Sequence, residues 1–189
     1  SHSEIPKWNC TILAFHKIAM NAEIEKVKIL SAGAITAKLT RMAFEIYERN
    51  LHATGGMVVA GITGMGTILG HLIATELRKI SPLQVEEVEV ILDKQAVSTS
   101  EVMLSVDIPL KGKTILLVDD VLNTGKTLVY ALKPFLGHEV EKMEIAVLVN
   151  RSHGLFPVKP DYTGFELATT FNEHIRVDFS DNSYAVQLH

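Results

Sequence analysis

The sequence predicts an α/β fold in which a central, mainly parallel sheet has helices on both faces. Three short apolar runs, at residues 57–62, 115–118 and 145–149, have the length and composition of strands buried on both sides. Segments with helical periodicity lie between these runs, and such alternation is typical of a parallel sheet. A chain of 189 residues with 47% hydrophobic residues is long enough for one domain with a sizeable core.

The first clear element is a helix that begins after Ser31. Ser31 is a suitable N-cap, and Asn50 with the Gly55-Gly56 pair is expected to end the helix. Apolar residues recur on one helical face, at Ile35, Leu39, Met42, Ala43, Ile46 and Tyr47. Residues 4–27 have no clean period, so a helix and a strand both remain open there. We therefore divide the chain into an N-terminal extension, 1–27, and a domain, 28–189.

A glycine-rich turn follows the first predicted strand. It reads Thr63, Gly64, Met65 and Gly66, and a helix is expected from about Thr67 to Lys79. Such a turn lets the backbone approach an anion, which the N-terminus of a helix also favours. Taken alone, the glycines could equally serve close packing.

Another strand is expected around Val85–Leu92, where apolar residues alternate with polar ones. The following polar stretch, 93–105, has two interpretations. It is either a mobile lid over an active site or a plain surface hairpin. A lid would matter chemically because it excludes water from the reaction.

The most informative stretch is 115–128. Asp119 and Asp120 end its apolar run, and they are suited to hold ribose hydroxyls or a divalent metal. A loop with amide and hydroxyl donors follows, as a phosphate site requires, at Asn123, Thr124, Gly125, Lys126 and Thr127. A nucleoside-triphosphate P-loop is excluded because Asp120 stands where that motif needs a glycine.

After this loop the apolar pattern predicts a helix that Pro134 shortens and Gly137 ends. The tail after Asn150 departs from the alternation of strands and helices, and Pro157 and Pro160 indicate irregular backbone. Two short edge strands are expected near residues 176–179 and 184–188.

Composition restricts the setting and the partners. A net charge of −4 gives no general attraction for nucleic acid, so RNA binding would need a local basic patch. Cys10 is the single cysteine, and no secretory leader is visible, so a reducing, cytoplasmic location is expected. Glycines interrupt the longest apolar region, 57–77, so no membrane contact is expected.

The strand, the Asp-Asp pair and the loop that ends in Thr127 together resemble the signature of type I phosphoribosyltransferases. The resemblance implies that family's fold, with a small hood beside the sheet. It implies that Asp119 and Asp120 hold the ribose hydroxyls of phosphoribosyl pyrophosphate, with Mg²⁺ bound through ligand and water. Residues 123–127 would bind the 5-phosphate, and Thr63–Gly66 the pyrophosphate.

Softer similarities, at 28–31, 48–50 and 146–153, resemble the bifunctional pyrimidine-operon regulators within this superfamily. Those proteins bind uridine nucleotides and a messenger-RNA leader, and they have uracil phosphoribosyltransferase activity. The resemblance implies uracil as the base and a homo-oligomeric assembly. Arg151, His153 and Phe156 are candidates for the base site, with ordinary surface-loop roles as the alternative.

Three departures from that branch affect function. Met65 stands where the family has an arginine, which favours an alternative function: a nucleotide-sensing regulator with little or no turnover. Of the residues proposed for RNA contact, Thr40, Arg41 and Arg49 match, while Phe44 and Gly154 do not. Asn123 stands where purine transferases have an aspartate, and its amide cannot act as a general base, which disfavours purines.

Overall fold

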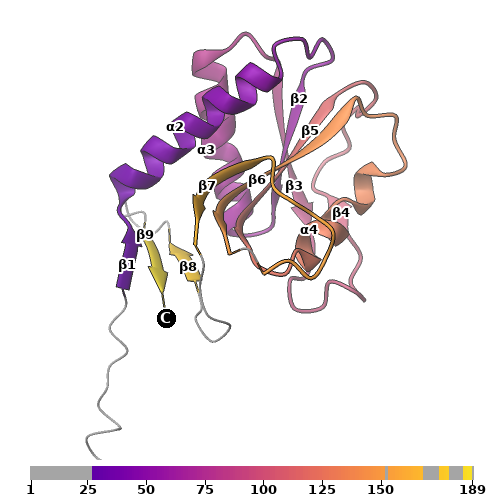
Figure 1. The fold of residues 1–189 in the computed structure, drawn as a ribbon. Helices are drawn as coiled ribbons and strands as arrows, with labels where there is room; N and C mark the ends of the chain where they lie inside the picture. The colour runs from indigo at the N-terminus through magenta and orange to yellow at the C-terminus, as the bar shows by residue number, and fades with distance from the viewer. Residues whose placement is uncertain (1–26, 152, 168–174, 179–184, 189) are drawn as a thin grey trace, which may run out of the picture.

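The computed structural model describes residues 27–151, 153–167, 175–178 and 185–188 (Figure 1). Its main sheet has the strand order β4-β3-β2-β5-β6-β7, and only β4 runs antiparallel to its neighbour. The strands span Met57–Ile62 (β2), Val85–Ile91 (β3), Met103–Leu104 (β4), Thr114–Leu122 (β5), Lys142–Asn150 (β6) and Tyr162–Glu166 (β7). The mainly parallel sheet predicted from sequence is thus confirmed.

Helices lie on both faces of this sheet, as predicted. Helices α2 (Ala32–Arg49) and α3 (Met65–Ile80) pack on one face, where they share an apolar layer with the strand residues Val59, Leu116 and Leu148. The short helix α4 (Lys126–Ala131) and a 3₁₀ turn, Lys133–Phe135, pack on the other face. Figure 1 shows α2 and α3 side by side, away from α4. The core therefore consists of two apolar layers with the sheet between them.

The local signals for α2 are confirmed, and so is the shortening of α4 at Pro134, although the helical residues end at Phe135, before Gly137. The Ser31 hydroxyl accepts a hydrogen bond from the Ala34 amide at 3.3 Å, and the Asn50 amide closes the last turn of α2 on the Tyr47 carbonyl. The predicted stripe is buried apart from Tyr47, which is half-buried. Helix α4 ends just before Pro134, which lies in the 3₁₀ turn. Proline at that point cannot donate the next helical hydrogen bond.

A second, antiparallel sheet forms the predicted hood. It contains β1 (Val27–Leu30), β9 (Ala185–Leu188) and β8 (Ile175–Asp178), in that order. Its buried side chains Leu30, Val177 and Val186 join the apolar layer of α2. Strands β8 and β9 fall close to the two predicted edge strands. Strand β1 was not predicted, and residues 1–26 of the proposed extension lie outside the described residues.

Two boundaries and one element differ from the sequence prediction. Strand β5 continues to Leu122, so the acid pair lies within the strand, and α3 begins at Met65 rather than at Thr67. Strand β7 replaces backbone that was expected to be irregular. This strand contains Gly164. A glycine is needed at that position because a Cβ there would be 2.7 Å from the Leu148 carbonyl oxygen. That glycine indicated a close approach between strands rather than an irregular loop.

Residues 93–105 form a hairpin connection. Strand β4 pairs with the end of β3, Val90 opposite Leu104. Val97 and Val102 are buried in the apolar layer of α4, so the loop between the strands is anchored at two points. The backbone of this segment is thus that of a hairpin, and its role as a mobile lid stays a prediction.

Candidate functional site

The acid pair lies at the carboxyl end of β5, between the parallel strands β2 and β6. Asp119 is only 3% exposed, and Asp120 is half-buried. The Asp119 carboxylate accepts a hydrogen bond from the Asp120 amide at 3.0 Å. Both acids are held by a strand whose preceding residues are fully buried, so their positions are fixed by the core.

A lysine that the sequence prediction missed completes this cluster. The ammonium of Lys94, in the loop after β3, lies 2.8 Å from Asp119 Oδ1 and 3.6 Å from Asp120 Oδ1. Burial lowers the pKa of Lys94, but the charges of Asp119 and Asp120 outweigh this, and its pKa is raised overall. Lys94 is therefore a cation at neutral pH.

The surroundings of Asp119 disfavour the charged form of its carboxyl group. Burial raises the pKa of its carboxyl, and the neighbouring charge of Asp120 raises it further. Lys94 opposes both effects, and the resulting pKa is about 7. A carboxylate in this state gains from any further hydrogen-bond donor or cation that reaches it.

The predicted phosphate loop follows β5 directly and encloses a hollow of about 150 Å³. The hollow is lined by Asp119 and by residues 121–128, so the structure brings the acid and the loop together. Two amides from the 155–156 segment donate to the Thr124 carbonyl, at 2.9 and 3.0 Å. Gly125 has a φ of +85°, and a Cβ there would be 2.6 Å from Val158 Cγ2, so the loop requires glycine.

The turn Thr63–Gly66 approaches the same acid from β2. A Cβ at Gly66 would lie 2.7 Å from the Val118 carbonyl oxygen and 3.2 Å from Asp119 Oδ1. The Thr63 hydroxyl donates to the Val90 carbonyl at 3.0 Å, which fixes the turn to β3. Met65, half-buried, begins α3, and the first turn of that helix has no acidic residue.

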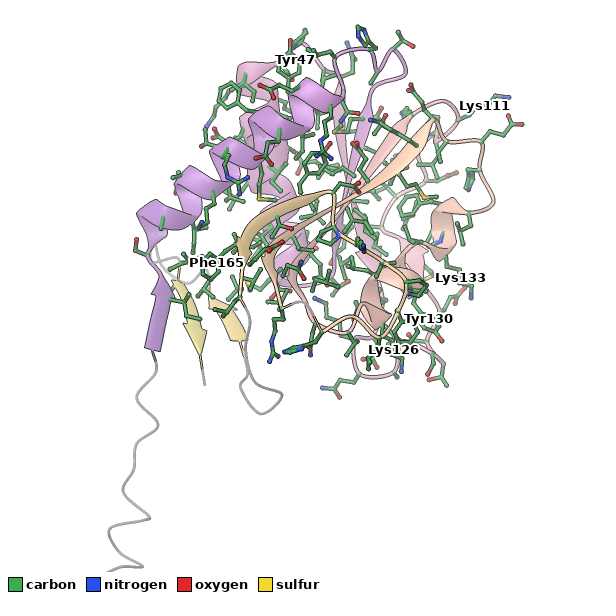
Figure 2. The ribbon with its side chains drawn as sticks, in the orientation of Figure 1. Tyr47, Lys111, Lys126, Tyr130, Lys133 and Phe165 are labelled. Atoms are coloured by element: carbon green, nitrogen blue, oxygen red, sulfur yellow. The ribbon has the colours of Figure 1, made fainter. Side chains whose placement is uncertain are left out.

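Figure 2 shows that Lys126 lies at the opposite end of the molecule from Tyr47 and Lys111. Lys111 precedes β5 and Lys126 follows it, so the loop lies at the carboxyl ends of the strands. This is the end of an open parallel sheet at which ligands bind.

The three candidates for a base site are distributed differently. Arg151 is 4% exposed, and its backbone amide donates to the Leu122 carbonyl at 2.9 Å, so it is not a surface-loop residue. His153 is half-buried. Phe156 lines a larger hollow, of about 710 Å³, together with Leu122 and Asn150. That hollow adjoins the phosphate loop through Leu122, which lines both.

The fold is that of an α/β protein with its candidate site at the carboxyl ends of the parallel strands, and the comparisons give its family. Residues 27–182 match the family described as "Phosphoribosyl transferase domain". The chain belongs to this family of pentosyltransferases. It is 34% identical to the "Bifunctional protein PyrR" of Streptococcus pneumoniae over 159 residues, which cover 82% of this chain and 90% of that protein.

Solved structures with the same fold include two hypoxanthine phosphoribosyltransferases. The enzyme from Trypanosoma cruzi superposes with a TM-score of 0.66 at 17% identity, covering 85% of this chain and 95% of its own. The enzyme from Staphylococcus aureus has a TM-score of 0.61 at 19% identity, covering 78% and 82%. These likenesses confirm the fold. Within the described residues, no helix is both long and apolar enough to cross a membrane.

Proposed function

We propose that this chain transfers the 5-phosphoribosyl group of phosphoribosyl pyrophosphate to uracil, giving uridine monophosphate and pyrophosphate. The observation that carries the proposal is the meeting of three elements around Asp119: the acid pair, the loop 123–127 and the turn Thr63–Gly66. Each suits one part of that substrate: ribose hydroxyls, 5-phosphate and pyrophosphate, respectively.

In the proposed reaction a bond forms between N1 of uracil and C1′ of the ribose. The bond from C1′ to the pyrophosphate oxygen breaks, and the N1 proton leaves to solvent. Asp119 and Asp120 accept hydrogen bonds from the ribose hydroxyls and favour the positive charge that develops on the sugar. No side chain forms a covalent intermediate, so catalysis comes from positioning and from charge.

The two carboxylates could hold Mg²⁺ only if substrate oxygens and water supplied its other ligands. The described residues contain no group of three or more His, Cys, Asp and Glu side chains that could hold a metal by themselves. Asp119 and Asp120 would hold Mg²⁺ together with substrate oxygens and water, which is the usual way that this ion binds in phosphate sites. When bound, it would offset the charge of the leaving pyrophosphate.

Uracil is preferred over a purine because of Asn123. This exposed residue is the first of the phosphate loop. Its amide can donate and accept hydrogen bonds but cannot take up a proton. A purine transferase would need a titratable group to act on N7. The structural neighbours are hypoxanthine transferases, but at 17–19% identity they support the fold and not the base.

A panel of bases tests the proposal. We expect turnover of phosphoribosyl pyrophosphate with uracil, and at least about tenfold lower kcat/KM with hypoxanthine, guanine and adenine. Release of pyrophosphate and formation of the monophosphate are measured in the presence of Mg²⁺. Tight binding of nucleotide without turnover on any base would contradict the enzymatic proposal.

A second function, RNA-binding regulation, is favoured by the relative named as bifunctional. The structure supplies an argument against two of its expected contacts. Arg41 pairs with Glu45 and donates to the Thr163 carbonyl at 2.7 Å, and Arg49 lies over the Tyr162 ring at 5.1 Å. Both side chains therefore hold α2 to β7, and freeing them for phosphate would weaken that contact.

A salt series separates specific RNA binding from general attraction. We measure affinity for a pyrimidine-operon leader RNA and for a shuffled RNA of equal length between low and physiological salt. A regulator retains a preference for the leader of at least about tenfold at physiological salt. Equal affinities that fall together with salt would rule this function out.

A further inference from the structure

The start of helix α3, where the pyrophosphate turn ends, has no side-chain cap. Gly64 is the N-cap residue, and glycine has no side chain that could accept a hydrogen bond from the first amides of the helix. The first turn of α3 contains no acidic residue either. A helix start of this kind leaves amides for an anion, as the proposed function requires. Its position must then be fixed by another element.

Strand β3 contacts both ends of this turn. At the first end, the Thr63 amide and hydroxyl both donate to the Val90 carbonyl, at 3.1 and 3.0 Å. At the second end, the Thr67 hydroxyl donates to Glu89 Oε1 at 3.2 Å. Glu89 and Val90 are consecutive residues of β3, so one short piece of strand holds the residues on either side of Gly64–Gly66.

The carboxylate of Glu89 determines the direction in which the Thr67 hydroxyl donates. A hydroxyl has one proton to donate, and Thr67 has a second acceptor within reach, the Ile62 carbonyl at 3.3 Å. A carboxylate is a stronger acceptor than a peptide carbonyl, so the proton goes to Glu89. Without this carboxylate the hydroxyl would donate to Ile62 in β2. The first turn of α3 would then lose its side-chain contact with β3.

Glu89 is itself held from both sides. On one side β3 pairs with β2, and Glu89 lies opposite Gly61. On the other side the Glu89 amide donates to the Ser105 hydroxyl at 3.0 Å, and the Ser105 amide donates to the Glu89 carbonyl at 2.9 Å. A half-buried carboxylate on a backbone fixed in this way can hold a neighbouring element in place.

Gly66 connects this contact with the ligand site. It lies next to Thr67 in the chain, and a Cβ on it would be 2.7 Å from the Val118 carbonyl oxygen and 3.2 Å from Asp119 Oδ1. A shift of the first turn of α3 therefore changes where the amides of the turn lie relative to the acid. The acid pair and the loop 123–127 belong to β5 and the residues after it, so they do not depend on Glu89.

We propose that Glu89 is a positioning residue for the pyrophosphate: through Thr67 it holds the start of α3 where the amides of the turn 63–66 bind that group. This inference rests on the proposed function and adds to it a residue outside the ligand site. Glu89 touches no substrate, and it acts on the turn alone. Its effect is therefore confined to ligands that contain pyrophosphate.

The test compares ligands with and without pyrophosphate. Dissociation constants for phosphoribosyl pyrophosphate, pyrophosphate and uridine monophosphate are measured by calorimetry, with Mg²⁺. The proteins are wild type, Glu89→Leu, Glu89→Gln, Thr67→Val and the double variant Glu89→Leu with Thr67→Val. Glu87→Leu is the matched control, because Glu87 lies two residues earlier on the same face of β3. It pairs with His71 and Arg78, which lie farther along α3 than the turn.

We expect Glu89→Leu and Thr67→Val each to weaken the two pyrophosphate-containing ligands about tenfold, because the amides of the turn are no longer held in place. Uridine monophosphate should bind within about threefold of wild type. The double variant should bind no more weakly than either single variant, because both changes remove the same contact. Glu89→Gln should retain most of the affinity, since its amide oxygen still accepts from Thr67. Glu87→Leu should change none of the constants.

Three results would overturn the inference. Equal weakening of all three ligands by Glu89→Leu would make Glu89 a general structural residue. Unchanged binding of all three would give it no role, and additive losses in the double variant would mean that Glu89 does not act through Thr67.

Should Glu89→Leu fail to fold, Thr67→Val tests the same contact from the other side, with Thr67→Ser, which keeps the hydroxyl, as the variant that restores binding. Unchanged pyrophosphate binding in Thr67→Val would then overturn the inference. Failure of wild type to bind phosphoribosyl pyrophosphate would instead refute the proposed function, and that result is seen without any substitution.

Discussion

The main sheet contains a buried carboxylate near each end of its parallel strands, and the two are surrounded very differently. Glu144, near the amino end of β6, is 7% exposed and accepts hydrogen bonds from Asn50 at 2.8 Å, from Tyr162 at 3.0 Å and from Lys142 at 3.0 Å. Asp119, near the carboxyl end of β5, lies beside a second acid, with one lysine to offset both charges.

The difference distinguishes a carboxylate that stabilises the fold, Glu144, from one that could bind a ligand, Asp119. Around Glu144 three donors converge on one carboxylate, and burial together with that charge raises the pKa of Tyr162, so its hydroxyl remains a donor. Around Asp119 there are two donors, the Lys94 ammonium and the Asp120 amide, but Lys94 is shared with a second acid, and the pKa of the Asp119 carboxyl is about 7. A buried acid that three donors satisfy holds elements together, whereas one that shares its lysine with a second acid has hydrogen-bonding capacity left for a ligand.

The largest expected effect is on catalysis, at Asp119. Asp119→Asn keeps the size of the side chain but removes the charge that holds the ribose. Since hydrogen bonds to charged groups contribute about 1.5–3 kcal/mol each, kcat/KM should fall about a hundredfold. Steady-state kinetics with uracil and phosphoribosyl pyrophosphate measure this. Activity within about threefold of wild type would remove Asp119 from the site.

The next effect is on stability, at the other carboxylate. Glu144→Ala leaves the Asn50 amide and the Tyr162 hydroxyl buried without their acceptor, and the free energy of unfolding should fall by about 3 kcal/mol. Urea denaturation measures the loss. Glu144→Gln is the matched control, because its amide oxygen still accepts hydrogen bonds and the loss should be smaller. The kcat/KM of the folded fraction should be unchanged in both variants.

A third prediction concerns the pH dependence of stability. The folded protein holds the Asp119 proton up to a pH of about 7, whereas the unfolded chain releases it near its ordinary pKa of 3.8. Between these values the folded state binds more protons, so this group lowers stability as pH rises. Asp119→Asn removes the titration.

We therefore expect Asp119→Asn to raise the melting temperature relative to wild type, and by more at about pH 8 than at about pH 5. A difference of several degrees is expected, since about 1 kcal/mol shifts the midpoint roughly 2–4 °C in a chain of this size. Thermal unfolding at the two pH values measures it. A gain of the same size at both pH values would argue against a raised pKa for the Asp119 carboxyl.

The smallest effect is expected for Tyr162→Phe. This change removes one of three donors to Glu144 but keeps the ring beneath Arg49. The loss should be about 1 kcal/mol in urea unfolding, because Asn50 and Lys142 still satisfy the carboxylate. A loss as large as that of Glu144→Ala would mean that the tyrosine hydroxyl alone holds the network.

The local parts of the site could be predicted from the sequence. The acid pair and the loop 123–127 are contiguous, so their residue types and spacing indicate their chemistry before any fold is known. Long apolar runs likewise located β2, β5 and β6, because strands covered on both sides need apolar residues at every position. Strand β7 was missed because Gly164 and two nearby prolines resemble the composition of a loop.

Lys94 could not be predicted because its role depends on a contact across 25 positions of sequence. A lone lysine in a polar loop is usually solvated, and no neighbouring residue in the sequence indicates that it contacts Asp119. The one available signal was its position just after a strand that neighbours β2, since carboxyl ends of parallel strands meet. The raised pKa of Asp119 could not be predicted for the same reason, because it depends on burial, which is a property of the fold.

Gly66 has a consequence for how this protein can change over evolution. Because the turn Thr63–Gly66 touches the backbone of β5 without an intervening side chain, the sites proposed for pyrophosphate and ribose form a single rigid unit. Mutation cannot adjust the separation of the two sites gradually, since any side chain at Gly66 would force the start of α3 away from β5. Variation in ligand preference is then confined to peripheral segments, the hairpin with Lys94 and the loop after β6. We expect related chains to differ there while this unit stays the same.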